Sequence, residues 1–387
     1  MNEADSLWLE KIFESCGYSK TEELADADVV LINSCSVRQA AEDKVYGLAP
    51  KIRGVKEAAG ETPEVKSARL GEALRRSTEE TPGVKEATGE YSPPTVILTG
   101  CMVGSATGER RRIKLNTLEK RMPWVDYFVP PGDIFEKLPE ILGKVRAQPR
   151  KTPPTINRDG VGELAALKNS PAGVVVEKGK AYVPIMRGCD NFCSYCVVPY
   201  GRGAETYRDF DEIVQDVERL VEEGVKSVTL LGQNVNSYPG FAKLLERIHD
   251  IECLEELWFL TSNPWDFPPK LIEVLALPKM RKHLHLALQS GDNEILAKMN
   301  RPYTVEEYKD LVAQIRDSVP EIELGTDLIV GFPGETVEQF QHTVDAVRDI
   351  DFDGAYIAMY SLRPGTAAAN RMEDNVPLEE KKRRHKV

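Results

Sequence analysis

The feature that most constrains the fold is a regular alternation of strand-like and helix-like segments that begins near Ala181. The successive segments are AYVPIM, DEIVQDVERLVEEG, SVTLLG, FAKLLERIHD, ELWFLTS, KLIEVLAL, HLHLALQSG, VEEYKDLVAQIRD, ELGTDLIVGF, VEQFQHTVDAVRD and AYIAMYS. Because a helix of this length returns the chain to a neighbouring parallel strand, the repeats indicate a parallel sheet covered by helices. Residues 179–387 are therefore predicted to form an α/β domain, most simply a full or partial barrel.

Polar side chains follow five of these predicted strands. They are Gln233-Asn234, Thr261-Ser262-Asn263, Gln289-Ser290, Asp327 and Tyr360-Ser361. The carboxyl ends of barrel strands meet at one face, so these residues predict an active site there. The alternative is that they are ordinary loop starts. Gln233, Asn234, Gln289 and Asp327 are the candidates for contacts with a cofactor.

Three cysteines lie close together in the segment RGCDNFCSYCVVPYGRGAETYR, residues 187–208, which we call the cysteine loop. Cys189, Cys193 and Cys196 can converge on one metal centre, because a short loop has no interior in which to bury three thiols. Three ligands suit an iron–sulfur cluster with one open iron. A structural zinc site would need a fourth Cys or His nearby, and the next such residue along the chain is the distant His249, followed by Cys253. Three unrelated thiols are the third reading.

The N-terminal part, residues 1–147, is predicted to be a second α/β domain with its own cysteines. A helical pattern in DSLWLEKIFESC precedes the buried strand VVLIN, and TVILTGCMVG forms a second strand–loop unit. Cys35 and Cys101 each follow a strand, at the end of an open sheet where ligands bind. Cys16 and Cys253 are interpreted as structural.

Two stretches interrupt this pattern. Residues 53–94 contain repeated sequences, ETPEVK with ETPGVK and GVKEAAGE with GVKEATGE, and no sustained apolar period. This composition predicts a solvated insertion that is disordered or marginally helical. Residues 148–178, which include QPRKTPP, are predicted to be a linker.

The net charge of −12 is unfavourable for binding nucleic acid, because phosphate contacts require Lys and Arg. A local basic face would still suffice. The clearest basic run, KKRRHK at residues 381–386, is interpreted as a solvated helix face or a frayed end. The seven cysteines, the absence of a long apolar run and an N-terminus unlike a signal peptide predict a cytosolic protein with no membrane segment.

The spacing Cys189-x3-Cys193-x2-Cys196, with Tyr195 before the third cysteine, resembles the signature of radical S-adenosylmethionine enzymes. More specifically, the chain resembles the methylthiotransferases that act on isopentenyladenosine 37 of tRNA. The resemblance rests on NSCSVR, TGCMV, VVPYGRG, LLGQNVNSY, TSNPWDF, HLALQSGDNEILAKMNRPYT, TDLIVGFPGET and SLRPGT. LLGQNVNSY favours this branch over relatives that modify threonylcarbamoyladenosine or a ribosomal protein.

This resemblance implies an open α/β methylthiotransferase domain followed by a radical S-adenosylmethionine partial (β/α) barrel, with two [4Fe–4S] clusters. The cluster on Cys189, Cys193 and Cys196 would bind S-adenosylmethionine and reduce it to a 5′-deoxyadenosyl radical. The second cluster, on Cys35, Cys101 and a cysteine expected upstream of residue 1, would supply the methylthio group for C2 of the adenine.

Further roles follow from the same resemblance. Tyr195 would lie beside the adenine of S-adenosylmethionine, and Gly331 and Glu335 would help to hold the nucleoside. The implied partners of a monomeric enzyme are tRNA, a reductase, and sulfur or iron–sulfur carrier proteins. Arg202, Arg208 and Lys298 are candidate tRNA contacts.

The chain ends after LEEKKRRHKV, and we expect it to be a fragment without the C-terminal TRAM barrel of its relatives. Two alternatives stay open. One is a non-catalytic or partly active remnant that binds RNA or carries a cluster. The other is a methylthiotransferase with another substrate.

Overall fold

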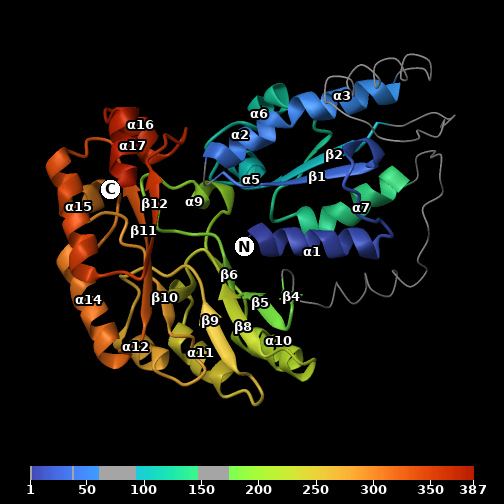
Figure 1. Ribbon diagram of the computed structural model, residues 1–387. Helices are drawn as coiled ribbons and strands as arrows, with labels where there is room; N and C mark the ends of the chain where they lie inside the picture. Colours follow the sequence, from blue (N-terminus) through green and yellow to red (C-terminus); the bar gives the residue numbers. More distant parts are fainter. Residues whose placement is uncertain (1, 37–38, 61–92, 147–173) are drawn as a thin grey trace, which may run out of the picture. The chain divides into compact units, whose positions relative to one another are not determined.

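The computed structural model describes residues 2–36, 39–60, 93–146 and 174–387 (Figure 1). The chain divides into two compact units. One consists of Met1–Trp8, Gly108–Ile113 and Gly173–Val387, and the other of Leu9–Thr107 and Lys114–Ala172. No helix in the described ranges is long and apolar enough to cross a bilayer.

The unit that contains residues 9–107 is built on a parallel sheet with the strand order β1-β2-β3. These strands are β1 (Val29–Ser34), β2 (Thr95–Gly100) and β3 (Tyr127–Phe128). The central strand β2 is buried at every position after Thr95, because the sheet continues on both sides of it. Helix α1 (Asn2–Ser15) contributes its residues from Leu9 onward to this unit. The other helical segments are η1 (Leu24–Asp26), α2 (Gln39–Gly47), α3 (Ala49–Gly60), α5 (Cys101–Thr107), α6 (Leu115–Arg121) and α7 (Ile134–Arg146).

Helix α3 overlaps the start of the predicted repeat insertion. The insertion was expected from about residue 53 as a disordered or marginally helical segment, and α3 continues to Gly60. Its buried residue Ile52 anchors this helix, so the residues that follow remain part of the folded unit. Residues 61–92, which hold most of the predicted insertion, lie outside the described residues.

The larger unit is a partial parallel barrel, which confirms the predicted fold class (Figure 1). Its strands are β4 (Val175–Glu177), β5 (Lys180–Pro184), β8 (Ser227–Leu231), β9 (Glu256–Phe259), β10 (His283–His285), β11 (Glu323–Val330) and β12 (Gly354–Met359). All neighbours are parallel except β4 and β5. The single parallel bridges Leu257–Met280 and Ser262–Leu286 continue the order from β9 into β10.

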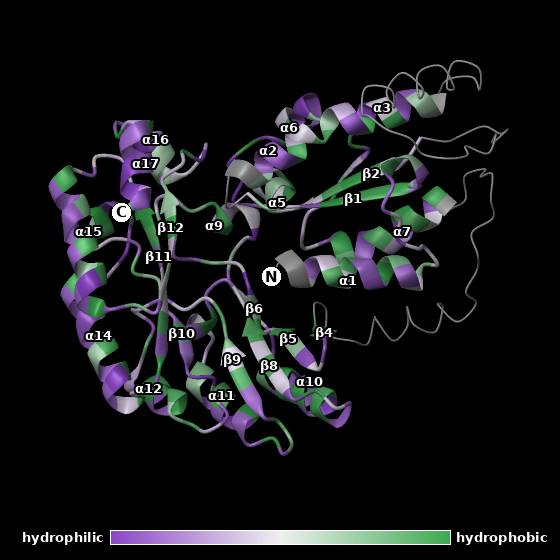
Figure 2. Ribbon diagram, in the orientation of Figure 1, coloured by the Kyte–Doolittle hydropathy of each residue, from purple (hydrophilic) through white to green (hydrophobic). Residues whose placement is uncertain are grey.

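Helices cover the outside of this barrel (Figure 1). They are α10 (Phe210–Glu222), α11 (Phe241–His249), α12 (Pro269–Leu275), α13 (Asn293–Lys298), α14 (Val305–Ser318) and α15 (Val337–Ile350). Figure 2 shows that α14 alternates hydrophobic and hydrophilic residues, as expected for a helix with one buried face. Thr304 and Thr336 each begin a helix with a capping box, which satisfies backbone N–H groups that the first turn leaves free.

Short elements complete the unit. They are β6 (Met186–Arg187), β7 (Thr206–Tyr207), α9 (Val198–Gly201), η2 (Val235–Ser237), α16 (Ala367–Arg371) and α17 (Leu378–Lys386). Helix α17 carries the basic run, and the prediction that this run is simply solvated is wrong. Lys381 and Arg384 are buried, because they point into contacts with Asp374 and Glu335 rather than into solvent.

Candidate metal centre on the cysteine loop

The two ends of the cysteine loop are held together by the antiparallel pair of β6 and β7. Directly after β6, Gly188 has a φ of 81°, and a Cβ there would lie 1.9 Å from the carbonyl oxygen of Ala204. The N–H of Gly188 donates to Oε1 of Gln233 at 2.6 Å, and the N–H of Cys189 donates to Gly203 at 3.2 Å. Gln233, predicted to contact a cofactor, therefore holds the start of the loop.

The structure brings together the three cysteines that the sequence singled out. Cys189 is buried, and the N–H of Cys196 donates to the carbonyl of Cys193 at 2.9 Å. Burial raises the pKa of Cys189 to about 11 and that of Cys196 to about 12, and the Cys193 thiol adds to the rise at both. The thiols therefore interact with one another, and a bound metal would displace their protons.

Three cysteine ligands suit an iron–sulfur cluster with one open iron. A tetrahedral zinc, with Zn–S bonds of about 2.3 Å, needs its ligand atoms close around one point. Within the described ranges, no three His, Cys, Asp or Glu side chains are arranged to hold one metal ion. A cubane cluster binds each cysteine to a different iron and so tolerates sulfurs that lie further apart.

The residues that follow α13 hold the cysteine loop through hydrogen bonds to its backbone. The N–H of Ser194 donates to the carbonyl of Met299 at 2.9 Å. The side-chain amide of Asn300 donates to the carbonyls of Asn191 at 3.0 Å and Phe192 at 3.1 Å. Asn300 has a φ of 59°, a left-handed conformation that asparagine tolerates better than most residues. These contacts fix the loop between its first and third cysteines.

A buried arginine touches the middle cysteine. Arg301 is 8% exposed, and its Nη1 donates to Sγ of Cys193 at 3.4 Å. Its Nη2 donates to the carbonyl of Ala287 at 3.1 Å. The guanidinium carbon lies 4.6 Å from the ring centre of Trp265 and 5.4 Å from that of Tyr303. Neither Asn300 nor Arg301 stands out in the sequence, although both belong to the stretch KMNRPYT that carries the family resemblance.

Tyr195 lies against an apolar cluster at the carboxyl ends of β11 and β12. The buried members of this cluster are Ile295, Met299, Phe332, Tyr360 and Ala368. Burial raises the pKa of the Tyr195 phenol, so the ring stays neutral. Tyr195 therefore joins the cysteine loop to this apolar cluster.

Glu335 and Gly331 are tied to α17. Oε2 of Glu335 accepts hydrogen bonds from the N–H of Gly331 and from Nη1 of Arg384, both at 2.6 Å. Gly331 has a φ of 68°, and a Cβ there would lie 2.4 Å from Cγ of Lys381. Their expected role toward a nucleoside stays a prediction. Their observed role is to pack the end of β11 against α17.

Two of the other predicted cofactor residues are also buried in contacts of their own. The amide of Asn234 donates to Glu205 at 3.5 Å and accepts a hydrogen bond from Asn263. Gln289 has a φ of 69°, and its N–H donates to the carbonyl of Asp327 at 2.8 Å. Both residues lie at strand ends as expected, and their contact with a cofactor stays a prediction.

Asp327 lies inside β11 rather than after it, because the apolar residues that follow extend the strand to Val330. Its Oδ2 is 3.0 Å from Nε2 of His285 on the neighbouring strand β10. Gly325 and Asp327 share one face of β11, and a Cβ on Gly325 would meet Nδ1 of His285 at 3.1 Å. His285 was not singled out from the sequence, and its only signal is the alternation in HLHL.

The three cations proposed for tRNA contacts differ in exposure. Arg202 is paired with Asp5 at 2.8 Å and its side chain is 4% exposed. Arg208 forms an ion pair with Asp216 and donates to the carbonyl of Pro184 at 3.1 Å. Lys298 is exposed at the end of α13. Of the three, Lys298 is the one whose charge faces solvent.

In the other unit, Cys35 and Cys101 lie at the carboxyl edge of the sheet. Ser34 and Gly100 are paired in register, and each is followed by one of the cysteines. A Cβ on Gly100 would lie 2.2 Å from the carbonyl oxygen of Ser34, so the two strand ends approach closely. Three buried hydroxyls near these cysteines have no hydrogen-bond partner among the described residues: Ser36, Thr99 and Ser105.

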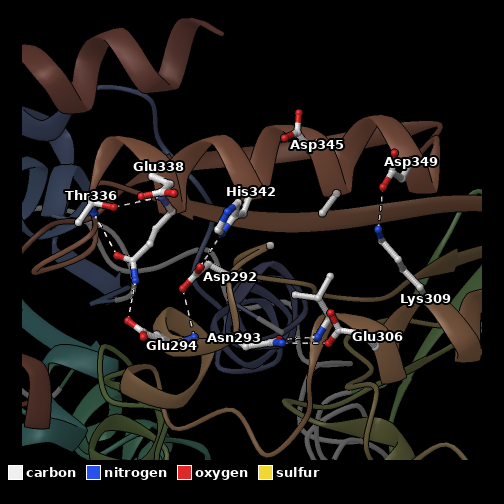
Figure 3. Close-up of a pocket in the computed structure, with 14 residues that line it drawn as sticks. Asp292, Asn293, Glu294, Glu306, Lys309, Thr336, Glu338, His342, Asp345 and Asp349 are labelled. Carbon is white, nitrogen blue, oxygen red and sulfur yellow. Dashed lines mark hydrogen bonds and ion pairs between the residues drawn. The ribbon is translucent and has the colours of Figure 1, made fainter.

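A separate surface pocket of about 670 Å³ lies among α13, α14 and α15 (Figure 3). Asp292 bonds Nδ1 of His342 at 2.8 Å there, and Lys309 is paired with Asp349 at 2.7 Å. The lining includes no cysteine, and six of its fourteen residues are acidic. The pocket is therefore distinct from the metal centre.

Solved structures confirm the fold. The chain resembles the radical S-adenosylmethionine methyltransferase TsrM of Kitasatospora setae, with a TM-score of 0.52 and 15% identity. The match covers 90% of this chain and 67% of the TsrM chain, in a structure with cobalamin and a [4Fe–4S] cluster bound.

Sequence comparisons define the family. Residues 183–347 match the Radical SAM superfamily, and residues 1–73 match the Uncharacterized protein family UPF0004. The tRNA-2-methylthio-N(6)-dimethylallyladenosine synthase of Dehalococcoides mccartyi is 39% identical over 100% of this chain and 78% of its own length. The synthase of Clostridium botulinum is 37% identical over 99% of this chain and 77% of its own length. The chain belongs to the tRNA-2-methylthio-N(6)-dimethylallyladenosine synthase family of radical S-adenosylmethionine enzymes.

Proposed function

We propose that this protein transfers a methylthio group to C2 of N6-isopentenyladenosine at position 37 of tRNA. The observation that carries the proposal is the cysteine loop, in which three interacting thiols lie in a protein whose full length resembles the synthases. The polar residues around this loop, and the apolar cluster against which Tyr195 packs, suit an enzyme that must bind S-adenosylmethionine and keep water from reactive species.

The donor set of the loop fits a [4Fe–4S] cluster. Cys189, Cys193 and Cys196 supply three sulfur ligands, and the Arg301 cation beside Cys193 balances a negatively charged group. When bound, the cluster supplies the electron that cleaves S-adenosylmethionine. The chain's own contribution is to fix the loop through Ser194 and the residues after α13, and to pack the ring of Tyr195 against the neighbouring apolar cluster.

We further propose a second cluster with Cys35 and Cys101 among its ligands. Support comes from the three buried hydroxyls of Ser36, Thr99 and Ser105, which lack partners in the described structure. A buried hydroxyl without a partner is unfavourable, and the sulfurs of a bound cluster would accept its hydrogen bond. This cluster would provide the sulfur that reaches the adenine.

The same proposal names the remaining partners. A monomer would work on tRNA in the cytoplasm, where tRNA is modified. It would need a reductase, because each cleavage of S-adenosylmethionine consumes one electron. It would also need a sulfur or iron–sulfur carrier, because each product molecule removes a sulfur atom.

Anaerobic reconstitution with iron and sulfide tests these assignments. The wild-type protein should bind a [4Fe–4S] cluster and release 5′-deoxyadenosine from S-adenosylmethionine when reduced with dithionite. Replacing Cys189, Cys193 and Cys196 by Ala should abolish that release. Replacing Cys35 and Cys101 by Ala should lower the iron content and leave the release intact. Cys253→Ala, at an exposed position outside both cysteine sets, is the matched control.

The substrate is tested on tRNA from a strain that lacks its own synthase. Mass spectrometry of the digested nucleosides should show 2-methylthio-N6-isopentenyladenosine after incubation with the wild-type protein. A wild-type protein that takes up no iron would contradict the enzyme assignment. A protein that cleaves S-adenosylmethionine but thiolates threonylcarbamoyladenosine or a ribosomal protein instead would contradict the substrate alone.

A further inference from the structure

We propose that Arg301 is a positioning residue that raises the reduction potential of the cluster on the cysteine loop, through its N–H bond to the sulfur of Cys193. This inference rests on the proposed function only in requiring that the loop bind a cluster. It assigns a role to a side chain that lies 108 residues from its cysteine in the sequence.

The guanidinium is fixed on three sides. Nη1 faces Cys193 at 3.4 Å, Nη2 faces the carbonyl of Ala287 at 3.1 Å, and Nε faces the hydroxyl of Tyr303 at 3.4 Å. The hydroxyl of Tyr303 is itself anchored to the carbonyl of Leu288 at 2.6 Å. Because the five N–H groups of arginine lie in one rigid plane, the contacts to Ala287 and Tyr303 leave Nη1 aimed at the sulfur.

Aromatic rings hold the same plane in place. The rings of Trp265 and Tyr303 are stacked, with centroids 5.8 Å apart and planes inclined by 21°. The guanidinium of Arg301 lies within 4.6 Å of the first centroid and 5.4 Å of the second. These cation–π contacts stabilise the arginine where few water molecules reach it.

The charge of Arg301 has no carboxylate to balance it. Its hydrogen-bond partners in the described part of the chain are a thiol, a phenol and a carbonyl. An uncompensated charge that is 8% exposed is costly, because little solvent remains to stabilise it. A cluster with three thiolate ligands carries negative charge, so binding it removes this cost.

The positive charge of Arg301 also determines whether the reduction potential of the cluster is raised or lowered. Reduction adds an electron to the cluster, and a neighbouring cation with an N–H···S bond stabilises the reduced form more than the oxidised form. The reduction potential is therefore higher with Arg301 in place. S-adenosylmethionine cleavage starts from the reduced cluster, so Arg301 increases the fraction of enzyme ready to react at a given external potential.

Potentiometric titration of the reconstituted protein, followed by EPR of the reduced cluster without S-adenosylmethionine, tests the proposal. Arg301→Gln should shift the midpoint potential to more negative values, and Arg301→Lys, which keeps the charge but not the planar fork, should shift it less. Arg316→Gln is the control, because Arg316 is also an arginine that donates to backbone carbonyls but contacts no cysteine. An Arg301→Gln protein with a full cluster and an unchanged midpoint would overturn the proposal.

A wild-type measurement avoids the risk that these variants fail to fold. Protein labelled with ¹⁵N at its arginine guanidinium groups should show ¹⁵N coupling in pulsed EPR of the reduced cluster, and absence of that coupling would also overturn the proposal. If the wild-type protein takes up no cluster, the proposed function fails as well. If it takes up a cluster without coupling, the inference about Arg301 fails alone.

Discussion

Gly188 illustrates how one backbone position shapes the metal centre. Its φ of 81° lies in the left-handed region, and its α-carbon approaches Ala204 too closely for any side chain. Gly203 has a similar φ of 85°, but a Cβ there would meet nothing within 4 Å. A substitution at Gly203 would therefore test the unfavourable backbone conformation alone, whereas one at Gly188 would add steric overlap with Ala204.

Gly188→Ala should displace the cysteine loop and lower iron uptake several-fold, because the new methyl group would overlap a backbone carbonyl. Gly203→Ala should cost about 1–2 kcal/mol of folding free energy from the positive φ alone and retain the cluster. Iron content and urea unfolding of both variants check this. Equal iron uptake by the two proteins would show that the overlap relaxes without harm.

His342 provides a pH-dependent contact on the pocket surface (Figure 3). The hydrogen bond that Nδ1–H of His342 donates to the Asp292 carboxylate is the main cause that raises the pKa of His342 above its ordinary value of 6.5, and Glu338 and Asp345 add to the rise. The protonated form is therefore favoured by folding. This stabilisation is present below pH 6.5 and disappears as the pH rises through the raised pKa.

Asp292→Asn should return the pKa of His342 toward its ordinary value while keeping the helix cap, because asparagine also caps helices. An NMR titration of the His342 ring measures it. Asp349→Asn is the control. Asp349 is an acidic residue of the same pocket, but it accepts a hydrogen bond from Lys309 and not from His342, so its replacement should leave the titration of His342 unchanged. A pKa that stays raised in Asp292→Asn would show that the more distant carboxylates dominate.

Helix α17 is held to the end of β11 by a buried ion pair. Arg384 on this helix is 3% exposed and pairs with Glu335, which follows β11. Lys382 on the same helix forms only an exposed pair with Glu379 at 2.8 Å. One helix thus offers a buried and an exposed ion pair for direct comparison.

Arg384→Met should lower the free energy of unfolding by about 3–5 kcal/mol, because it leaves the buried Glu335 carboxylate without its charged partner. Lys382→Met should change it by less than about 1 kcal/mol, since exposed pairs contribute little. Urea denaturation of both variants measures the difference. Similar costs would mean that Glu335 becomes protonated or solvated without its arginine.

The molecule as a whole carries a net charge of −12, which opposes the approach of tRNA. Arg202 and Arg208 are already paired with Asp5 and Asp216, so their charge is largely neutralised within the protein. Of the three cations proposed for tRNA contacts, the exposed Lys298 is therefore the one best placed to meet a phosphate. Each contact between a cation of the protein and a phosphate of tRNA contributes a fixed amount to the salt dependence of the binding affinity.

Lys298→Ala should weaken tRNA binding and reduce the slope of log affinity against log salt by about 0.7–0.9, the value for one phosphate contact. Lys309→Ala is the control, because Lys309 is paired with Asp349 in the acidic pocket. Filter binding at several salt concentrations gives both slopes. An unchanged slope for Lys298→Ala would remove this residue from the tRNA interface.

Periodicity and spacing within the sequence were enough to predict the partial barrel, the strands before Cys35 and Cys101, and the cysteine loop. Each of these signals is local: it needs only the residues of one element or one loop. Distant contacts leave no such signal. The burial of Lys381 and Arg384 was missed for this reason, because it depends on where α17 packs.

The cysteine loop likewise combines features that the sequence predicts with contacts that only the tertiary structure shows. Three cysteines at spacings of four and three already indicate a metal centre, since thiols so close in sequence are also close in space. Their environment comes from folding, which places Arg301 against Cys193 and Asn300 against the loop backbone across more than a hundred residues. The three cysteines can be recognised in the sequence because they are neighbours in the chain. The contact of Arg301 with Cys193 appears only in the tertiary structure, which brings residues far apart in the sequence together.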